Sequence, residues 1–350
     1  CQKDHPIALI KQVIYSFFQR ETNINQFFDT LPTQVSTKAN FDSLLVEKDH
    51  PSRSFHDTYY IDSETVLRTH TSAHQVELLR HGHRRFLVSG PCFRRDTIDR
   101  SHYPIFHQME GVCLFENPCP LATHRQRTEA HMKKTLETMV AHLFGENTPM
   151  RWVSEYFPFT EPSWELEIFF NNDWMEVLGC GVIHPGVLEN AHIDPSQHCG
   201  WAFGHGIDRL AMILFQIPDI RLFWSKDERF HQQFRGLSEK LKNASSHHDI
   251  FPVFSSYSKF PPSERDISFW LPQNGFYENA FYDLVRTIVG DWAEDVCKID
   301  EFVHPKTGRA SQTYRIVYRS MDRSLTNAEV NQVQQKLRDS VEKDYGVELR

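Results

Sequence analysis

"RWVSEYFPFTEPSWELEIFFNNDWMEVLGCGVI", residues 151–183, is the stretch that decides the fold class. It contains three segments rich in aromatic and β-branched residues, RWVSEYFPF, SWELEIFF and WMEVLGCGVI, and each predicts a strand. Pro-Ser and Asn-Asn-Asp turns separate the three segments. Because consecutive strands joined by such short turns pair antiparallel, we expect a meander here.

Segments with helical periodicity lie before and after this meander. HPIALIKQVIYSFFQR (5–20) and RTEAHMKKTLETMVAHLFG (127–145) precede it, and GHGIDRLAMILFQI (204–217) follows it. Each repeats apolar residues at intervals of three and four, which is typical of a helix with one buried face. The sequence therefore predicts an α+β fold, in which helices flank an antiparallel sheet.

The order of elements changes after residue 262. Residues 263–350 read as strand, helix, strand, strand, helix capped by Thr326, and a last strand. This βαββαβ order is that of the ferredoxin-like fold. Residues 235–262 are polar and predict a linker, so we expect three consecutive parts: 1–234, 235–262 and 263–350.

Composition limits the classes of protein that fit. The chain has 350 residues, 40% of them hydrophobic, and a formal net charge of −8, which argues against a basic coat for duplex DNA but leaves local patches possible. Its seven cysteines form no CxxC pair, so neither a disulfide framework nor a zinc site is expected. No apolar run reaches the roughly 20 residues of a membrane span. The sequence begins at Cys1, so a targeting segment could already be missing.

The stretch FRRDTIDRSHYPIFHQMEG (93–111) concentrates possible chemistry. Arg94 follows a predicted strand, and a guanidinium can hold a phosphate through two hydrogen bonds, although a surface ion pair is also possible. Phe106, Gln108 and Glu110 alternate along a second strand and so share one face. Their side chains suit an ammonium group beside an aromatic ring, but such alternation is also that of any half-buried strand.

Other patterns are weaker on their own. Phe157 and Phe159 lie on one face around a proline and could clamp a flat apolar group or pack in the core. Gly204 and Gly206 precede Arg209 without the third glycine of a dinucleotide-binding fingerprint. None of these patterns alone identifies a function.

Their order along the chain resembles that of the class II aminoacyl-tRNA synthetases, and among them the organellar, monomeric phenylalanyl-tRNA synthetase family. HPSRSFHDTYYI resembles motif 1 of that family, residues 93–111 resemble motif 2 with its loop, and GWAFGHGIDRLAMILFQIPDIRLFW resembles motif 3. RTHTSAHQ, YFPFTEPS and EVLGCG are similar to the segments of its phenylalanine pocket. Residues 263–350 resemble its ferredoxin-like anticodon-binding domain.

The resemblance implies roles for individual residues. Arg94 would hold the α-phosphate of ATP and Arg209 the γ-phosphate, and both would act in catalysis. The remaining ATP contacts would come from the motif 2 loop, from two rings near adenine and from an acid that could act through Mg²⁺: Ser101, His102, Tyr103, Phe106, Phe203 and Glu176. The amino and carboxyl groups of phenylalanine would lie among His70, Ser72, Gln75, Gln108 and Glu110, and Phe157 and Phe159 would pack edge to face on its phenyl ring.

The implied function is ATP-dependent attachment of L-phenylalanine to tRNA(Phe) through an adenylate, by a monomer in the mitochondrial matrix without a membrane partner. Two alternatives stay open: a protein that forms an adenylate but passes the acyl group elsewhere, and a non-catalytic RNA-binding relative. Residues 258–350 carry 13 Lys and Arg against 15 Asp and Glu, so we expect tRNA contact through a local patch with aromatic stacking. Its candidate cations are Arg286, Lys306, Arg309, Arg315 and Arg319. One departure from the family pattern lies in GHGIDR (204–209), which contains His205 and has Asp208 where a larger acid is expected.

Overall fold

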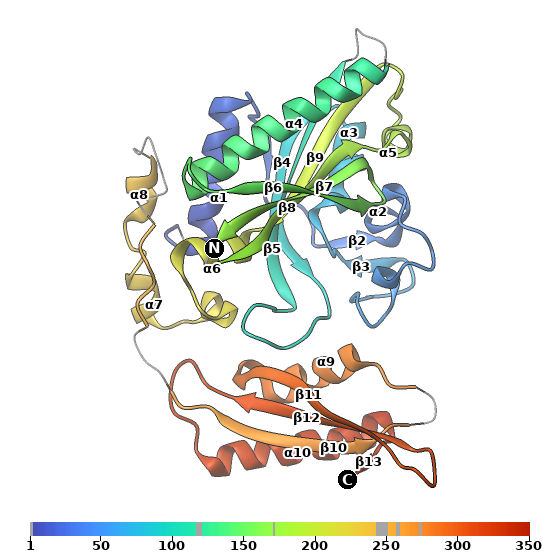
Figure 1. Ribbon diagram of the computed structural model, residues 1–350, viewed down its shortest axis with the longest axis vertical. Helices are drawn as coiled ribbons and strands as arrows, with labels where there is room; N and C mark the ends of the chain where they lie inside the picture. Colours follow the sequence, from blue (N-terminus) through green and yellow to red (C-terminus); the bar gives the residue numbers. More distant parts are fainter. Residues whose placement is uncertain (1–2, 117–120, 171, 243–250, 257–259, 273–274) are drawn as a thin grey trace. The chain divides into compact units, whose positions relative to one another are not determined.

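The computed structural model describes residues 3–116, 121–170, 172–242, 251–256, 260–272 and 275–350. The chain forms two compact units (Figure 1). The first contains residues 1–93, 105–217 and 233–254, and the second contains residues 94–104, 218–232 and 255–350. The units therefore do not follow the three consecutive parts expected from the sequence, because two short segments from within 1–234 belong to the second unit.

The first unit is built on a seven-stranded sheet with the order β1-β4-β5-β9-β8-β7-β6. Every neighbouring pair is antiparallel except β1 with β4, and the expected meander is confirmed as β6, β7 and β8. The strands are β1 (Phe27–Phe28), β4 (Arg85–Phe93), β5 (Ile105–Glu116), β6 (Met150–Phe157), β7 (Thr160–Phe170), β8 (Asp173–Ile183) and β9 (His198–Gly206). A two-stranded sheet of β2 (Gln34–Ser36) and β3 (Thr65–Leu67) lies in the same unit.

Strand alternation gives this sheet two different faces. On one face, which we call the helix face, α1 (Pro6–Glu21) and α4 (Leu121–Phe144) pack against β9, with Phe18 stacked on Phe203 and Trp201 donating a hydrogen bond to His131 (Figure 1). α6 (Ile207–Phe215) follows β9 directly. These three helices confirm the helical segments expected from sequence periodicity.

Short elements cover the other face, and they cover it at one end only. α3 (Gln75–Arg80), α5 (Pro185–Asn190) and residues 41–46, which follow α2 (Thr37–Asn40), supply an apolar cluster over Phe86, Val88, Val112 and Ala202. The rest of this face carries glycines, and we call it the glycine face. It holds the candidate site described below.

The segment expected to be a linker contains a helix, α8 (Leu237–Lys242). Leu237 and Leu241 are one turn apart and both are buried, so this stretch packs on the first unit rather than spanning solvent. The parts of the expected linker at 243–250 and 257–259 lie outside the described residues.

The second unit has the expected βαββαβ order. Its four-stranded sheet, β11-β12-β10-β13, carries its helices on one face, over a core that includes Ile267, Phe269 and Val330. The elements are β10 (Ser263–Trp270), α9 (Glu278–Val289), β11 (Ala293–Val303), β12 (Ala310–Tyr318), α10 (Asn327–Tyr345) and β13 (Glu348–Leu349). The short helix α7 (Glu228–Gln232), in the segment 218–232, also belongs to this unit. Thr326 forms the predicted cap, a complete capping box with Glu329. Among the described residues, no helix is long and apolar enough to cross a membrane.

Candidate active site

Four glycines remove side chains from the glycine face in the middle of the large sheet. Glu110 pairs with Gly204, which pairs in turn with Gly179 on β8, and Gln108 pairs with Gly206. Paired residues of an antiparallel ladder point to the same face, so Gln108 and Glu110 project beside a floor without side chains. Phe106 shares that face, which confirms the alternation expected along β5. Gly181, in register with Ala202, extends the same floor.

A buried polar group lies at one side of this floor. Glu110 is 3% exposed, receives a hydrogen bond from Ser72, and has a second carboxyl oxygen without a hydrogen-bond partner among the described residues. Burial raises the pKa of Glu110 to about 8. Gln75, which is 1% exposed, has neither its amide nitrogen nor its amide oxygen hydrogen-bonded within the described chain.

Gln108 connects this polar group to the segment that precedes α3. Its side-chain oxygen accepts a hydrogen bond of 3.1 Å from the backbone N–H of Thr71. Buried polar groups are nearly always hydrogen-bonded in folded proteins. The unsatisfied atoms of Glu110 and Gln75 are therefore suited to a ligand that carries an ammonium group and an acceptor.

Aromatic rings border the same floor. The rings of Phe157 and Phe159 lie 6.0 Å apart at 12°, and His70 lies 6.2 Å from Phe159. A Cβ added to Gly179 would approach the Phe157 ring to 2.8 Å, so this ring lies directly over the glycine. Phe159 also packs against the apolar cluster of the covered end. Core packing, one of the two functions considered from sequence, is thus seen for Phe159, and the clamp stays a prediction.

A charged region follows on β7, β8 and α6. Burial raises the pKa of Glu165, and the carboxylates of Glu176, Glu155 and Glu167 raise it further, while Arg209 acts in the opposite direction. The Cβ of Arg209 lies 3.9 Å from a Cβ built on Gly206, so its side chain leaves the backbone beside the glycine floor. Arg209 and Glu176 therefore lie in one electrostatic neighbourhood around Glu165.

The carboxylates of this neighbourhood have the oxygen chemistry that Mg²⁺ prefers. Their mutual repulsion, seen in the raised pKa of Glu165, would be relieved by a divalent cation. Within the described ranges, however, no three His, Cys, Asp or Glu side chains form a ready metal cage. The residues fit an ion that is held partly by a substrate rather than by the protein alone.

The structure contradicts one expected contact, that of Phe203 with adenine. Phe203 pairs with Gly111 and Cys180, so it points to the helix face, opposite the floor. Its ring is 2% exposed and stacks on Phe18 at 5.2 Å. Because neighbouring strand residues point to opposite faces, Phe203 must point away from the face of Gly204, and the sequence alone allows this inference. Phe203 is therefore not an adenine contact.

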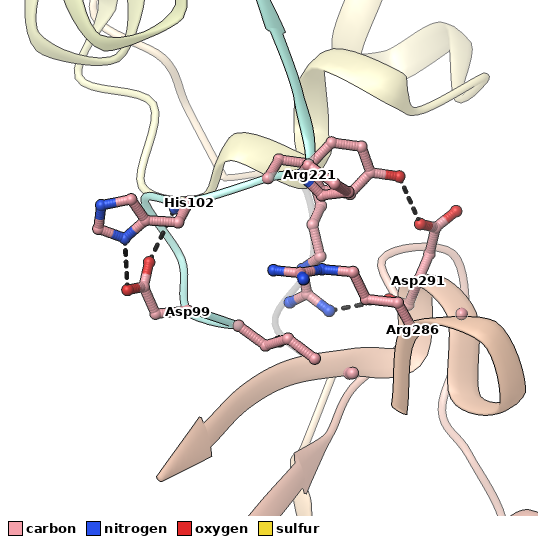
Figure 2. A pocket seen from close by; sticks show the side chains of 10 residues that line it. Asp99, His102, Arg221, Arg286 and Asp291 are labelled. Atoms are coloured by element: carbon pink, nitrogen blue, oxygen red, sulfur yellow. Dashed lines mark hydrogen bonds and ion pairs between the residues drawn. The ribbon is translucent and has the colours of Figure 1, made fainter. Parts of the chain in front are cut away.

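The remaining nucleotide candidates lie in the segment 94–104 of the second unit. The backbone N–H of Arg94 donates to the carbonyl of Pro104 and closes this loop. Figure 2 shows the pocket beside it, with the labelled side chains of Asp99, His102, Arg221, Arg286 and Asp291 around it.

Several loop side chains have partners within the second unit. Asp99 accepts hydrogen bonds from the backbone N–H groups of Ser101 and His102 and forms an ion pair of 2.6 Å with the His102 ring (Figure 2). Burial would raise the pKa of Asp99, but the hydrogen bonds from His102 and Ser101 outweigh it and hold the pKa below its usual range. Tyr103 donates to Asp291 at 2.9 Å. The loop is thus ordered by contacts within the second unit.

Sequence reasoning missed one buried side chain next to the site. Arg68 is 1% exposed, donates to the carbonyl of Pro91, and lies so close to Gly90 that a Cβ there would meet its guanidinium. The glycine before Pro91 was a signal of such a close approach.

Comparisons with known proteins agree with this geometry. The sequence profile described as "tRNA synthetases class II core domain (F)" matches residues 2–234, and the one described as "Ferredoxin-fold anticodon binding domain" matches residues 258–350. The chain is 51% identical to the chloroplastic/mitochondrial phenylalanine–tRNA ligase of Arabidopsis thaliana over 99% of its own length and 78% of the relative's. It is 44% identical to the mitochondrial enzyme of Dictyostelium discoideum, over 100% and 86% of the two chains. It is 38% identical to the mitochondrial enzyme of Saccharomyces cerevisiae, over 100% of this chain and 88% of the relative.

Proposed function

We propose a residue-level account of amino-acid activation from the premise that this chain belongs to the class II tRNA synthetases and, within them, to the phenylalanine–tRNA ligases. Its function is the ATP-dependent attachment of phenylalanine to tRNA(Phe). The reaction has two steps: the phenylalanine carboxylate attacks the α-phosphorus of ATP and releases pyrophosphate, and the resulting phenylalanyl-adenylate then acylates the tRNA.

Phenylalanine binds on the glycine face in this proposal. Its ammonium group lies against Glu110, with Gln108, Ser72 and His70 nearby, and Gln75 completes the polar side. The observation that carries the assignment is the buried carboxyl group of Glu110, which has one oxygen without a hydrogen-bond partner among the described residues and lies in register with Gly204 of the glycine face. The phenyl ring lies along Phe157, whose own ring lies over Gly179, and along Phe159, where aromatic contacts favour a flat apolar group.

The nucleotide is held by cations and one ring. Phe106 shares the glycine face and stacks on adenine, Arg209 holds the γ-phosphate, and Arg94 holds the α-phosphate. Ser101, His102 and Tyr103 supply loop contacts to ATP. The two guanidinium groups neutralise charge as the carboxylate oxygen approaches phosphorus, so catalysis rests on positioning and electrostatics rather than on a protein nucleophile.

We also assign Mg²⁺ as the cofactor. Glu176, together with Glu165, would hold the ion against the phosphates, and when bound the ion supplies positive charge for the departing pyrophosphate. Burial is the main cause of the raised pKa of Glu165, and the neighbouring carboxylates raise it further; a cation would relieve this repulsion, which supports the assignment.

A patch on the second unit is our candidate for contact with unpaired tRNA bases. It consists of Trp270, Phe302, His304, Arg309 and Arg350, and we call it the aromatic–arginine patch. Trp270 and Phe302 pair with the same residue of β12, Ser311, so they project from the sheet face opposite the core residues Ile267 and Phe269. The guanidinium of Arg309 lies 4.8 Å from the Trp270 ring, and that of Arg350 lies 4.9 Å from the Phe302 ring.

The chemistry of this patch suits single-stranded RNA. Exposed rings on a four-stranded sheet stack with bases, and arginines add cation–π and phosphate contacts. Among the candidate cations, Arg315 is paired with Asp266, Arg319 with Glu294, and Arg286 donates to the carbonyl of Thr97. Arg309 also forms an ion pair, with Glu348, but it lies in the patch over the Trp270 ring, and Lys306 lies in the exposed turn that leads to it.

The relatives are named mitochondrial, and this protein is accordingly a mitochondrial enzyme. We further propose that it acts in the matrix and as a monomer.

The test of this function is amino-acid-dependent ATP–pyrophosphate exchange across the twenty amino acids. We expect exchange with phenylalanine and a loss of about 100-fold or more in Arg94→Ala, the size typical for a group that stabilises transition-state charge. Arg95→Ala is the matched control, since Arg95 pairs with Asp283 instead. Exchange with no amino acid would exclude the enzyme and favour an RNA-binding protein.

A further inference from the structure

The large sheet has an irregular end where β9 turns into α6. The last pair between β5 and β9 is Gln108 with Gly206, and from Ile207 onward the chain is helical. β5 extends further, to Ile105, so its residues before Gln108 have no backbone partner from β9. On the other side, His107 lies opposite Pro91, which has no N–H to donate.

A side chain takes the place of the missing strand. Asp208, the second residue of α6, is 2% exposed, and its Oδ2 accepts a hydrogen bond from the backbone N–H of His107. Its Oδ1 lies 3.3 Å from Nδ1 of the same histidine. A buried backbone N–H without an acceptor is costly, so this carboxylate satisfies a group that the end of β9 would leave unpaired.

The hydrogen bond joins two elements that carry different parts of the proposed site. On β5, His107 lies between Phe106 and Gln108, which project onto the glycine face. On α6, Asp208 directly precedes Arg209, which starts beside Gly206 and acts electrostatically on Glu165. The carboxylate therefore links the start of α6 to the strand that holds the adenine and amino-acid contacts.

We propose that Asp208 is a positioning residue for the nucleotide: by accepting the His107 backbone N–H, it fixes where Arg209 stands relative to Phe106, and so the placement of the triphosphate. The inference rests on the proposed function, since it assigns to this residue a part in ATP binding. Glu110 is hydrogen-bonded by Ser72 and Gln108 by the backbone N–H of Thr71, so we expect phenylalanine binding not to depend on Asp208.

The test uses ATP–pyrophosphate exchange with separate KM values for ATP and phenylalanine, and a thermal melt for each variant. Asp208→Ala removes the acceptor, and we expect the KM for ATP to rise about tenfold, as for loss of a charge-assisted hydrogen bond, with the KM for phenylalanine within about twofold of wild type. Asp208→Asn keeps an acceptor oxygen and is expected to restore the KM for ATP to within about threefold.

A matched variant separates the backbone contact from the ring contact. His107→Ala keeps the backbone N–H and loses only the imidazole, so we expect a KM for ATP close to wild type. If Asp208→Ala does not fold, Asp208→Ser, whose hydroxyl is too short to replace the carboxylate, is expected to show the same rise specific to ATP.

Two results would overturn the proposal. Equal rises in both KM values would make Asp208 a general structural residue, and an Asp208→Asn variant as impaired as Asp208→Ala would show that charge rather than N–H acceptance matters. Wild-type exchange with phenylalanine is measured first, so a failure of the proposed function is recognised before the variants are interpreted.

Discussion

Glu110 is the residue on which the account of the site depends. Its carboxyl group is buried, and its pKa of about 8 means that it is mostly protonated at neutral pH before a ligand binds. A substrate ammonium beside it would favour the ionised form and lower that pKa. Binding of phenylalanine near neutral pH should therefore release a proton from the protein.

His205 provides a contrasting case on the helix face. It stacks on Phe203, and burial lowers its pKa to about 3. In the unfolded chain it takes up a proton near the ordinary histidine pKa of 6.5, whereas in the folded state it stays neutral. Its contribution to stability is therefore intact above pH 6.5 and is lost as pH falls toward 3.

Replacing His205 with an apolar residue should remove this acid sensitivity. We expect His205→Leu to lose less free energy of unfolding than wild type between pH 7 and pH 5, measured by urea unfolding at both values. His81→Leu, at an exposed position, is the control and should follow wild type. An unchanged pH dependence in His205→Leu would show that His205 is not the group responsible.

At the scale of elements, the glycine floor gives a test of the phenylalanine pocket. A methyl group at Gly179 would meet the Phe157 ring at 2.8 Å and displace it. We expect Gly179→Ala to raise the KM for phenylalanine about tenfold, a loss within the range for overpacking a filled site, with a smaller effect on the KM for ATP. Steady-state exchange kinetics measure both constants.

Gly206→Ala is the matched control on the same face. A Cβ there has no atom nearer than 3.9 Å among the described residues, and the glycine is not at a positive φ. Its KM for phenylalanine should stay near that of wild type. If both alanine variants affected phenylalanine equally, the pocket beside Phe157 would be wrongly placed.

Several elements were predictable because their signals are local. The meander of β6, β7 and β8 and the capped helix α10 follow from periodicity and short turns, and alternation placed Phe106, Gln108 and Glu110 on one face. The insertion of β9 between β5 and β8 was not predictable, because no local pattern tells which distant strand it pairs with.

The same limit applies to single residues. Phe203 resembled a nucleotide contact in its motif, but its face is set by pairing with Gly111 and Cys180. The incomplete hydrogen bonding of Gln75 depends on neighbours from several segments, and no spacing in the sequence reports it. The function of Asp208 depends likewise on where β9 ends.

In the whole molecule, amino-acid activation and tRNA contact are assigned to different sites. Trp270→Ala should lower tRNA charging at limiting tRNA about tenfold, since stacking on one ring contributes roughly 1–3 kcal/mol per base, while ATP–pyrophosphate exchange stays unchanged. Tyr277→Ala, an exposed ring outside the aromatic–arginine patch, is the control and should leave both activities intact. Equal losses in exchange and charging would mean that Trp270 supports the fold rather than RNA binding.

The most direct measurement of the central claim is calorimetric binding of phenylalanine at pH 7 in buffers of different ionisation enthalpy, for wild type and Glu110→Gln. The account predicts release of close to one proton per phenylalanine bound by wild type, because a carboxyl with a pKa of about 8 ionises beside the ammonium group. It predicts no such release and weaker binding in Glu110→Gln. Equal affinity and equal proton release in the two proteins would contradict the assignment of Glu110 and, with it, the placement of phenylalanine on the glycine face.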